Sequence, residues 1–161
     1  MSTNASLDAR VANFETAVKP KLQVVLNGLK KGDPTAFKRI AEDQSVVDVV
    51  FVGFENKSPR LILRYFHAHS SEKSVDITIG RKNCPGDCDS GIAYAAIGHH
   101  DAVDAEIARD PAIWAHMGLE GAIQHLVQSE IDRYPDVAGP PIAILELTAQ
   151  GPNWIQKGKC Q

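Results

Sequence analysis

Apolar residues recur along the N-terminal part of the chain with the period of an amphipathic helix. From Ser6 to Lys31 an apolar residue returns at every third or fourth position, and charged residues fill most of the remaining positions. The apolar stripe consists of Leu7, Val11, Phe14, Val18, Leu22, Val25 and Leu29. Pro20 lies inside the stripe and removes a backbone donor, so we expect a kink or a short break near Val18 to Lys19.

The residues after this helix predict a second, shorter helix. Gly32 is typical of a helix end, because glycine adopts the left-handed conformation found there without steric cost. Asp33 places a carboxylate where the first helical amides need an acceptor, and Pro34 suits the first helical position. We expect the helix to end at about Asp43. Its expected inward-facing residues are Phe37, Ile40 and Ala41.

The stretch from Ser45 to Gly53 is apolar almost without interruption and rich in β-branched residues. This pattern is typical of a strand buried on both faces and predicts a strand at Val46 to Phe54. A polar turn at residues 55–59 leads into residues 60–66, which we interpret as the second strand of a hairpin. Residues 75–79 alternate with a period of two, as a half-exposed or edge strand does.

Residues 80–91 combine proline, glycines and aspartates, and this composition predicts a loop. A strand of small residues is expected next, at Ile92 to Ile97. Asp101 is then expected to be the N-cap of a helix that runs to about Arg109.

The C-terminal part predicts one more helix and two strands. Asp110-Pro111 restarts the helical pattern, and residues 119–131 form an amphipathic helix that stops at Tyr134-Pro135. Residues 142–148 and 154–156 are expected to pair as a hairpin. Helices and strands therefore occur in blocks, which favours an α+β fold over alternating βαβ units. The length fits one domain, expected to cover residues 1–161.

The composition excludes several classes of function. The net charge is −3 and the basic residues are scattered, so we expect no nucleic-acid partner. No run of about 18 apolar residues occurs, so we expect no membrane partner. Three cysteines are too few for a disulfide framework, which favours a reducing compartment and a cytoplasmic location.

Cys84 and Cys88 are the strongest candidates for a metal site. Zinc takes four nitrogen or sulfur ligands, and a spacing of three intervening residues is permissible. The other residues that could complete such a site are His67, His69, His99, His100 and Cys160. Because the chain has neither a second cysteine pair nor two histidines spaced for one helix face, we favour a loop that contains two thiols, with no metal and no cofactor. A redox role is disfavoured because the spacing is not Cys-x-x-Cys.

The turn Gly98-His99-His100-Asp101 is the strongest candidate for a catalytic site. A turn that leads into a helix presents free backbone amides, which bind anions or hold an oxyanion. The alternative, which we favour, is that His99 and His100 are surface residues and Asp101 only caps the helix. No nucleophile elbow, P-loop or dinucleotide-binding glycine motif occurs.

The order of these segments resembles the later portion of the proteasome-type N-terminal-nucleophile (Ntn) hydrolases. The helix pair at Ser6–Asp43 is followed by Val-Val-Phe-Val-Gly-Phe at 49–54 and a hairpin. Ala96-Ile97-Gly98 then resembles the turn that opens the family's second helix pair. Residues 117–123 are similar to its helix start, and residues 138–144 with 151–155 to its final hairpin. The resemblance implies a four-layer αββα sandwich, two stacked antiparallel sheets between helix layers.

The chain departs from the family where the chemistry lies. Active members begin with a Thr, Ser or Cys whose own amino group is the general base. Removal of Met1 would expose Ser2 as the N-terminal residue. Residues 2–5 lead directly into the first helix, however, so the opening strands are missing from the pattern. The supporting aspartate is displaced to Asp136, and Ala138 stands where the family has a serine. The weak catalytic candidates are His99, His100, Asp101 and Asp136.

Three hypotheses follow. The first is a catalytically silent Ntn-like domain that acts through self-association or as a partner module, with an open sheet edge that a second copy covers. The second is a small hydrolase or metal-dependent enzyme with its site at Gly98–Asp101 and the Cys84–Cys88 loop. The third is an unrelated structural or interaction domain.

Overall fold

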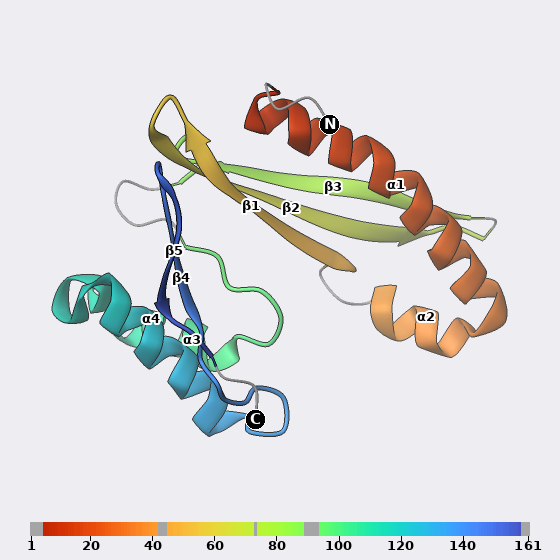
Figure 1. Ribbon diagram of the computed structural model, residues 1–161. Coiled ribbons are helices and arrows are strands. Elements are labelled where there is room, and N and C mark those ends of the chain that lie inside the picture. The colour runs from red at the N-terminus through yellow and green to blue at the C-terminus, as the bar shows by residue number, and fades with distance from the viewer. Residues whose placement is uncertain (1–4, 42–44, 73, 89–93, 159–161) are drawn as a thin grey trace. The chain divides into compact units, whose positions relative to one another are not determined.

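The computed structural model describes residues 5–41, 45–72, 74–88 and 94–158. The chain falls into two compact units, Met1–Ala93 and Tyr94–Gln161, and each is described by itself. A single domain over residues 1–161 stays a prediction. Figure 1 shows the helices and strands of both units.

Two helices open the first unit: α1 at Leu7–Gly32 and α2 at Pro34–Ala41. α1 is continuous through Pro20, so the expected break is wrong. The reason is packing on both sides of the proline, because Phe14 before it and Leu26 after it both pack against residues of the sheet. Asp33 caps α2 as expected, since its Oδ1 accepts from the Ala36 amide at 2.9 Å.

A three-stranded antiparallel sheet follows, in the order β1-β2-β3. Its strands are β1 at Val47–Glu55, β2 at Ser58–Ser70 and β3 at Val75–Cys84. The expected hairpin is β1-β2, closed by Asn56 and Lys57 at positive φ. The expectation that a loop begins at Gly80 is wrong, because β3 continues pairing with β2 as far as Leu61 opposite Cys84.

The buried centre of the sheet is β2, and this corrects the expectation for β1. No residue of β1 is fully buried, and Val52 is 55% exposed. β2 instead carries the buried residues Ile62, Leu63 and Phe66. β2 has a neighbour on each side and β1 has one, so an apolar run that looks like a central strand in the sequence forms an edge strand here.

The core of the first unit lies between α1 and one face of this sheet. Figure 1 shows α1 lying along the sheet. Phe14 of α1 packs edge-to-face on Phe51 of β1 and Phe66 of β2, with ring centroids 5.1 and 6.3 Å away. The buried core residues are Leu26, Phe37, Phe66, Val75 and Ile77.

The second unit contains α3 at Asp101–Arg109, α4 at Ile113–Arg133 and a hairpin of β4 at Ile144–Thr148 with β5 at Gly151–Gln156. Gly118 interrupts α4 with φ 69° and ψ 169°. Of the strand expected at Ile92–Ile97, residues 92 and 93 lie outside the described part, and residues 94–97 form no strand. The side chains there are mostly small and give a strand little surface to pack.

The structure is therefore α+β, with a three-stranded and a two-stranded antiparallel sheet. The core of the second unit is formed by Ile113, Ala122 and Leu126, with Val103, Ile107 and Trp114 packed against it. Among the described helices, none has the length and apolar character needed to cross a membrane.

Candidate functional site

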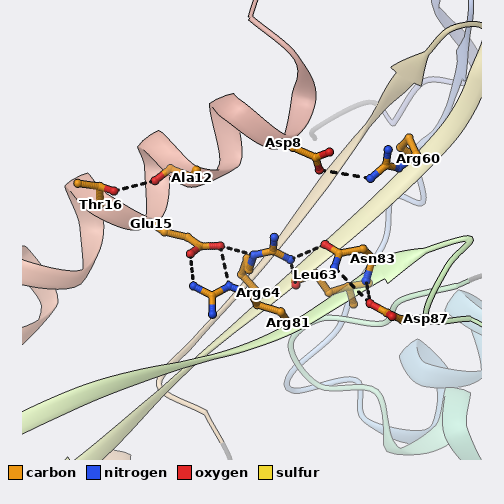
Figure 2. A network of polar contacts seen from close by, with 10 residues as sticks. All are labelled: Asp8, Ala12, Glu15, Thr16, Arg60, Leu63, Arg64, Arg81, Asn83 and Asp87. Atoms are coloured by element: carbon orange, nitrogen blue, oxygen red, sulfur yellow. Dashed lines mark hydrogen bonds and ion pairs between the residues drawn. The ribbon is translucent and has the colours of Figure 1, made fainter.

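Charged side chains from α1, β2 and β3 form two groups of ion pairs on the helix-covered face of the sheet: Asp8 with Arg60, and Glu15 with both Arg64 and Arg81 (Figure 2). Two carboxylates of α1 meet three arginines of the strands in pairs that join the helix to the sheet. We call this set the α1 clamp; its members are Asp8, Glu15, Arg60, Arg64 and Arg81. Asp8 and Glu15 are two helical turns apart, so they lie on the same side of α1. Arg60 and Arg64 are four residues apart in β2, so they lie on the same face of the strand and can meet these carboxylates.

Arg64 is the centre of the α1 clamp and is only 6% exposed. Its Nε donates to Glu15 Oε1. Its Nη1 donates to the Leu63 carbonyl at 2.8 Å and to Asn83 Oδ1 at 3.0 Å. A buried guanidinium is costly unless it is paired and hydrogen-bonded, and here it is both.

Glu15 is held ionised by the two arginines. The hydrogen bond from Arg81 has the largest effect on the pKa of the Glu15 carboxyl and lowers it; burial opposes this, and the hydrogen bond from Arg64 lowers it further. The net pKa is below its usual value. Arg81 is 54% exposed, so its pairing with Glu15 is screened by water, whereas the Arg64 pairing is not.

Cys84 and Cys88 form a disulfide that closes the turn after β3. Within this turn Asp87 Oδ2 accepts from the Asn83 backbone amide at 2.8 Å and from Asn83 Nδ2 at 3.2 Å. The interpretation of this turn as a loop with two thiols is therefore wrong. The reducing compartment and the cytoplasmic location stay predictions. In the described part of the chain no three His, Cys, Asp or Glu residues are grouped to hold a metal.

The other residues considered for a metal lie apart from this turn or outside the described part. His67 and His69 lie on β2, and His69 Nε2 is 2.6 Å from Thr78 Oγ1 on β3. Cys160 lies outside the described residues. His99 and His100 belong to the second unit, whereas Cys84 and Cys88 belong to the first.

The amides expected to be free at the start of α3 are occupied. Glu130 of α4 is 4% exposed, and its Oε2 accepts from the amides of Ala102 at 2.9 Å and Val103 at 3.3 Å. Its Oε1 is hydrogen-bonded to His99 Nδ1. Glu130 therefore fills the place an anion or oxyanion would take, and the expectation of free amides at this turn is wrong.

Glu130 is ionised in this position. Burial raises the pKa of the Glu130 carboxyl, but the hydrogen bonds from His99 and from the two amides lower it more, so the net pKa is below its usual value. The His99 ring also packs edge-to-face on Tyr134 at 4.3 Å. The arrangement has the chemistry of a helix cap: a carboxylate at the positive end of α3.

The remaining catalytic candidates lie at the surface. His100, and not Asp101, is the N-cap residue of α3, and its Nδ1 lies 2.9 Å from Asp104 Oδ2. Asp101 is the first residue of the helix. Asp136 lies in an exposed turn after α4. Among the described contacts of these residues, only that of His99 is with a buried side chain, the Glu130 carboxylate, and the His99 side chain itself is 33% exposed.

Sequence reasoning missed the two buried charges, Arg64 and Glu130. The sequence contains an indication that Arg64 is buried: it interrupts the apolar run Leu-Ile-Leu-Arg-Tyr-Phe, and it lies on the same strand face as Ile62 and Phe66. Glu130 carried one as well, since it lies beside Ile131 on the apolar side of α4. Neither pattern identifies the residues with which Arg64 and Glu130 pair.

No family model matches the chain, and no curated protein or solved structure matches it either.

Proposed function

We propose that the protein is an interaction module that associates with a second copy of itself through the outer edge of β1. The observation that carries this proposal is the position of β1: the described residues pair with it only through β2. An edge strand presents a row of backbone donors and acceptors that a second strand can pair.

The composition of β1 suits pairing. Between Asp48 and Glu55 the strand reads Val-Val-Phe-Val-Gly-Phe and carries no charge or proline. At about 3.3 Å per residue, a strand of this size offers an edge roughly 30 Å long. Proteins that avoid edge pairing place charges, prolines or bulges on such strands, and the middle of β1 has none of these.

The opposite edge of the sheet, β3, is protected in the usual ways. Asn27 Oδ1 of α1 accepts from the Val75 amide at 3.0 Å, and Gln23 Nε2 donates to Asp76 Oδ1 at 2.9 Å. The strand also carries Arg81 and Lys82. This contrast between the two edges supports β1 as the pairing edge.

The charges of β1 favour a particular register for two antiparallel copies. A two-fold axis at Phe51 places Asp48 of one copy opposite Phe54 of the other. A shift that places the axis between Phe51 and Val52 sets Asp48 opposite Glu55 twice, and like charges directly opposite each other destabilise a sheet. The favoured pairing joins the two three-stranded sheets into one antiparallel sheet.

The test is a matched pair of charge substitutions measured by sedimentation velocity over a wide concentration range. Val52→Lys puts a charge in the middle of β1 at a side chain that is 55% exposed, so the monomer tolerates it. Val24→Lys makes the same change on α1 at a side chain that is 73% exposed. We expect Val52→Lys to weaken association at least tenfold, about 1.4 kcal/mol, and Val24→Lys to leave it unchanged.

A wild-type chain that stays monomeric at every concentration would overturn the proposal. So would an assembly that Val24→Lys weakens as much as Val52→Lys.

For the fold, we propose the αββα sandwich of the Ntn-hydrolase type without its hydrolytic activity. The order of elements supports it: a helix pair, a hairpin-led sheet, a second helix pair and a final hairpin. A crystal structure with two stacked sheets between helix layers would agree with this proposal. Sheets that do not stack would refute it and leave the β1 proposal standing.

A further inference from the structure

The turn after β3 connects a disulfide to the α1 clamp through one side chain. Cys84 and Cys88 close the turn covalently, and Asp87 between them holds both the backbone and the side-chain amide of Asn83. The Asp87 amide returns a hydrogen bond to the Asn83 carbonyl at 2.8 Å. The side chain of Asn83 is therefore fixed from the turn.

Asn83 also contacts the centre of the clamp. Its Oδ1 accepts from Arg64 Nη1 at 3.0 Å, and Arg64 in turn donates to Glu15 of α1. Figure 2 shows this path from Asp87 through Asn83 and Arg64 to Glu15. The disulfide turn and the N-terminal half of α1 are thus joined by consecutive contacts that all lie in the first unit.

We propose that this turn is a thiol-sensitive switch that controls how firmly the N-terminal half of α1 is held on the sheet. Pro85, Gly86 and Asp87 are exposed, and hydrogen bonds in reach of water hold a turn weakly. With the disulfide closed, the Asp87 carboxylate stays beside Asn83. With it open, the turn gains conformational freedom, Asp87 leaves Asn83, and Arg64 loses a fixed acceptor.

The chemistry is exchange with a dithiol. A thiolate of the dithiol attacks the sulfur of Cys88, whose residue is the more exposed of the two, and the Cys84 sulfur leaves as a thiolate and takes a proton. The second thiol of the dithiol then attacks the mixed disulfide and releases the Cys88 thiol. Two electrons pass to the protein, and the dithiol becomes a cyclic disulfide.

The experiment is hydrogen–deuterium exchange of the full chain before and after treatment with dithiothreitol, in a Cys160→Ser background that prevents exchange through the third cysteine. Thiol titration first counts the cysteines that react before and after treatment. We expect at least threefold faster exchange of amides in the first half of α1 after reduction. Amides of α4, in the other unit, serve as the internal control and should not change.

Asn83→Ala distinguishes a switch that acts through Asn83 from a disulfide that only stabilises its own turn. The variant keeps the disulfide but removes the contact with Arg64, so reduction should no longer change the exchange of α1. Ser58→Ala, beside the same turn in a groove of about 490 Å³, is the matched control and should respond like the wild type.

Three outcomes would overturn the proposal: two free thiols at Cys84 and Cys88 before treatment, an α1 exchange rate that does not change on reduction, or an Asn83→Ala variant that responds as the wild type does.

Discussion

Replacing Glu15 by glutamine removes the only carboxylate that the described contacts give Arg64. The change keeps the shape of the side chain but leaves a guanidinium that is 6% exposed without its counter-charge. Breaking a buried pair in this way costs about 3–5 kcal/mol. Arg64 keeps its bonds to the Leu63 carbonyl and to Asn83, which places the cost near the lower end of that range. Arg81 adds less than about 1 kcal/mol, because it is half exposed.

The double variant Glu15→Leu/Arg64→Met provides the comparison. Replacing both members of a buried pair by apolar residues of similar volume is often neutral or stabilising. We therefore expect the double variant to be more stable than Glu15→Gln, although it lacks both charges. This order distinguishes the penalty of an unpaired buried charge from a general loss of packing.

The assay is urea unfolding followed by two signals. Both tryptophans, Trp114 and Trp154, lie in the second unit, so their fluorescence reports that unit and serves as the control. Residue-level amide exchange in β2 reports the first unit. We expect Glu15→Gln to lower the free energy of unfolding of the first unit by about 3 kcal/mol.

The same pair makes a prediction about pH. The pKa of Glu15 is lowered in the folded state, so the stabilisation it contributes is fully present above the usual carboxyl value of 4.5 and is lost as the pH falls through the lowered pKa. The wild type should therefore lose stability as the pH falls from 4.5 through the lowered pKa of Glu15. Glu15→Gln has no carboxyl at this position, so it should not show the loss of stability that Glu15 causes. A stability loss below about 1 kcal/mol, or a double variant less stable than the single one, would refute the reasoning.

Two further predictions concern the second unit. Glu130→Gln should speed amide exchange at Ala102 and Val103, because a neutral side chain holds these amides and His99 less strongly; unchanged exchange, measured by NMR, would contradict the capping role. Gly118→Ala should cost about 1–3 kcal/mol by tryptophan fluorescence, because the backbone there is nearly glycine-specific. A Cβ added at Gly118 would meet no atom within 4 Å, so any cost comes from the backbone conformation and not from a steric clash. Gly139→Ala is the control: a Cβ there also meets no atom within 4 Å, but φ is not positive, so this substitution should cost little.

The elements that the sequence predicted well are those whose signal is local. The helix α1 and the cap at Asp33 need only neighbouring residues, and both agree with the structure. The predicted apolar stripe of α1 is wrong at Val25, which is 63% exposed, because the neighbouring Leu26 is the residue buried in the core. The amphipathic helix expected at residues 119–131 lies within α4, and Gly118 precedes it with a non-helical backbone. Periodicity and capping are properties of a single segment and can be read without a partner.

The features that the sequence predicted poorly depend on a partner distant in the chain. The apolar run of β1 has the same pattern in a central strand and in an edge strand, and only the number of neighbouring strands distinguishes the two. Residues 80–84 extend β3 because β2 is long enough to pair with them. Glu130 meets His99 and the start of α3 across more than twenty residues of sequence, which no spacing rule anticipates.

The interaction proposal rests on the outer edge of β1, and residue-resolved amide exchange at low and high protein concentration tests it most directly. Alternate amides of β1 point away from β2. We predict that raising the concentration protects every second amide between Val47 and Glu55 and leaves β3 unchanged. Exchange of β1 that does not depend on concentration, or new protection confined to β3 or to the β4-β5 hairpin, would contradict the account.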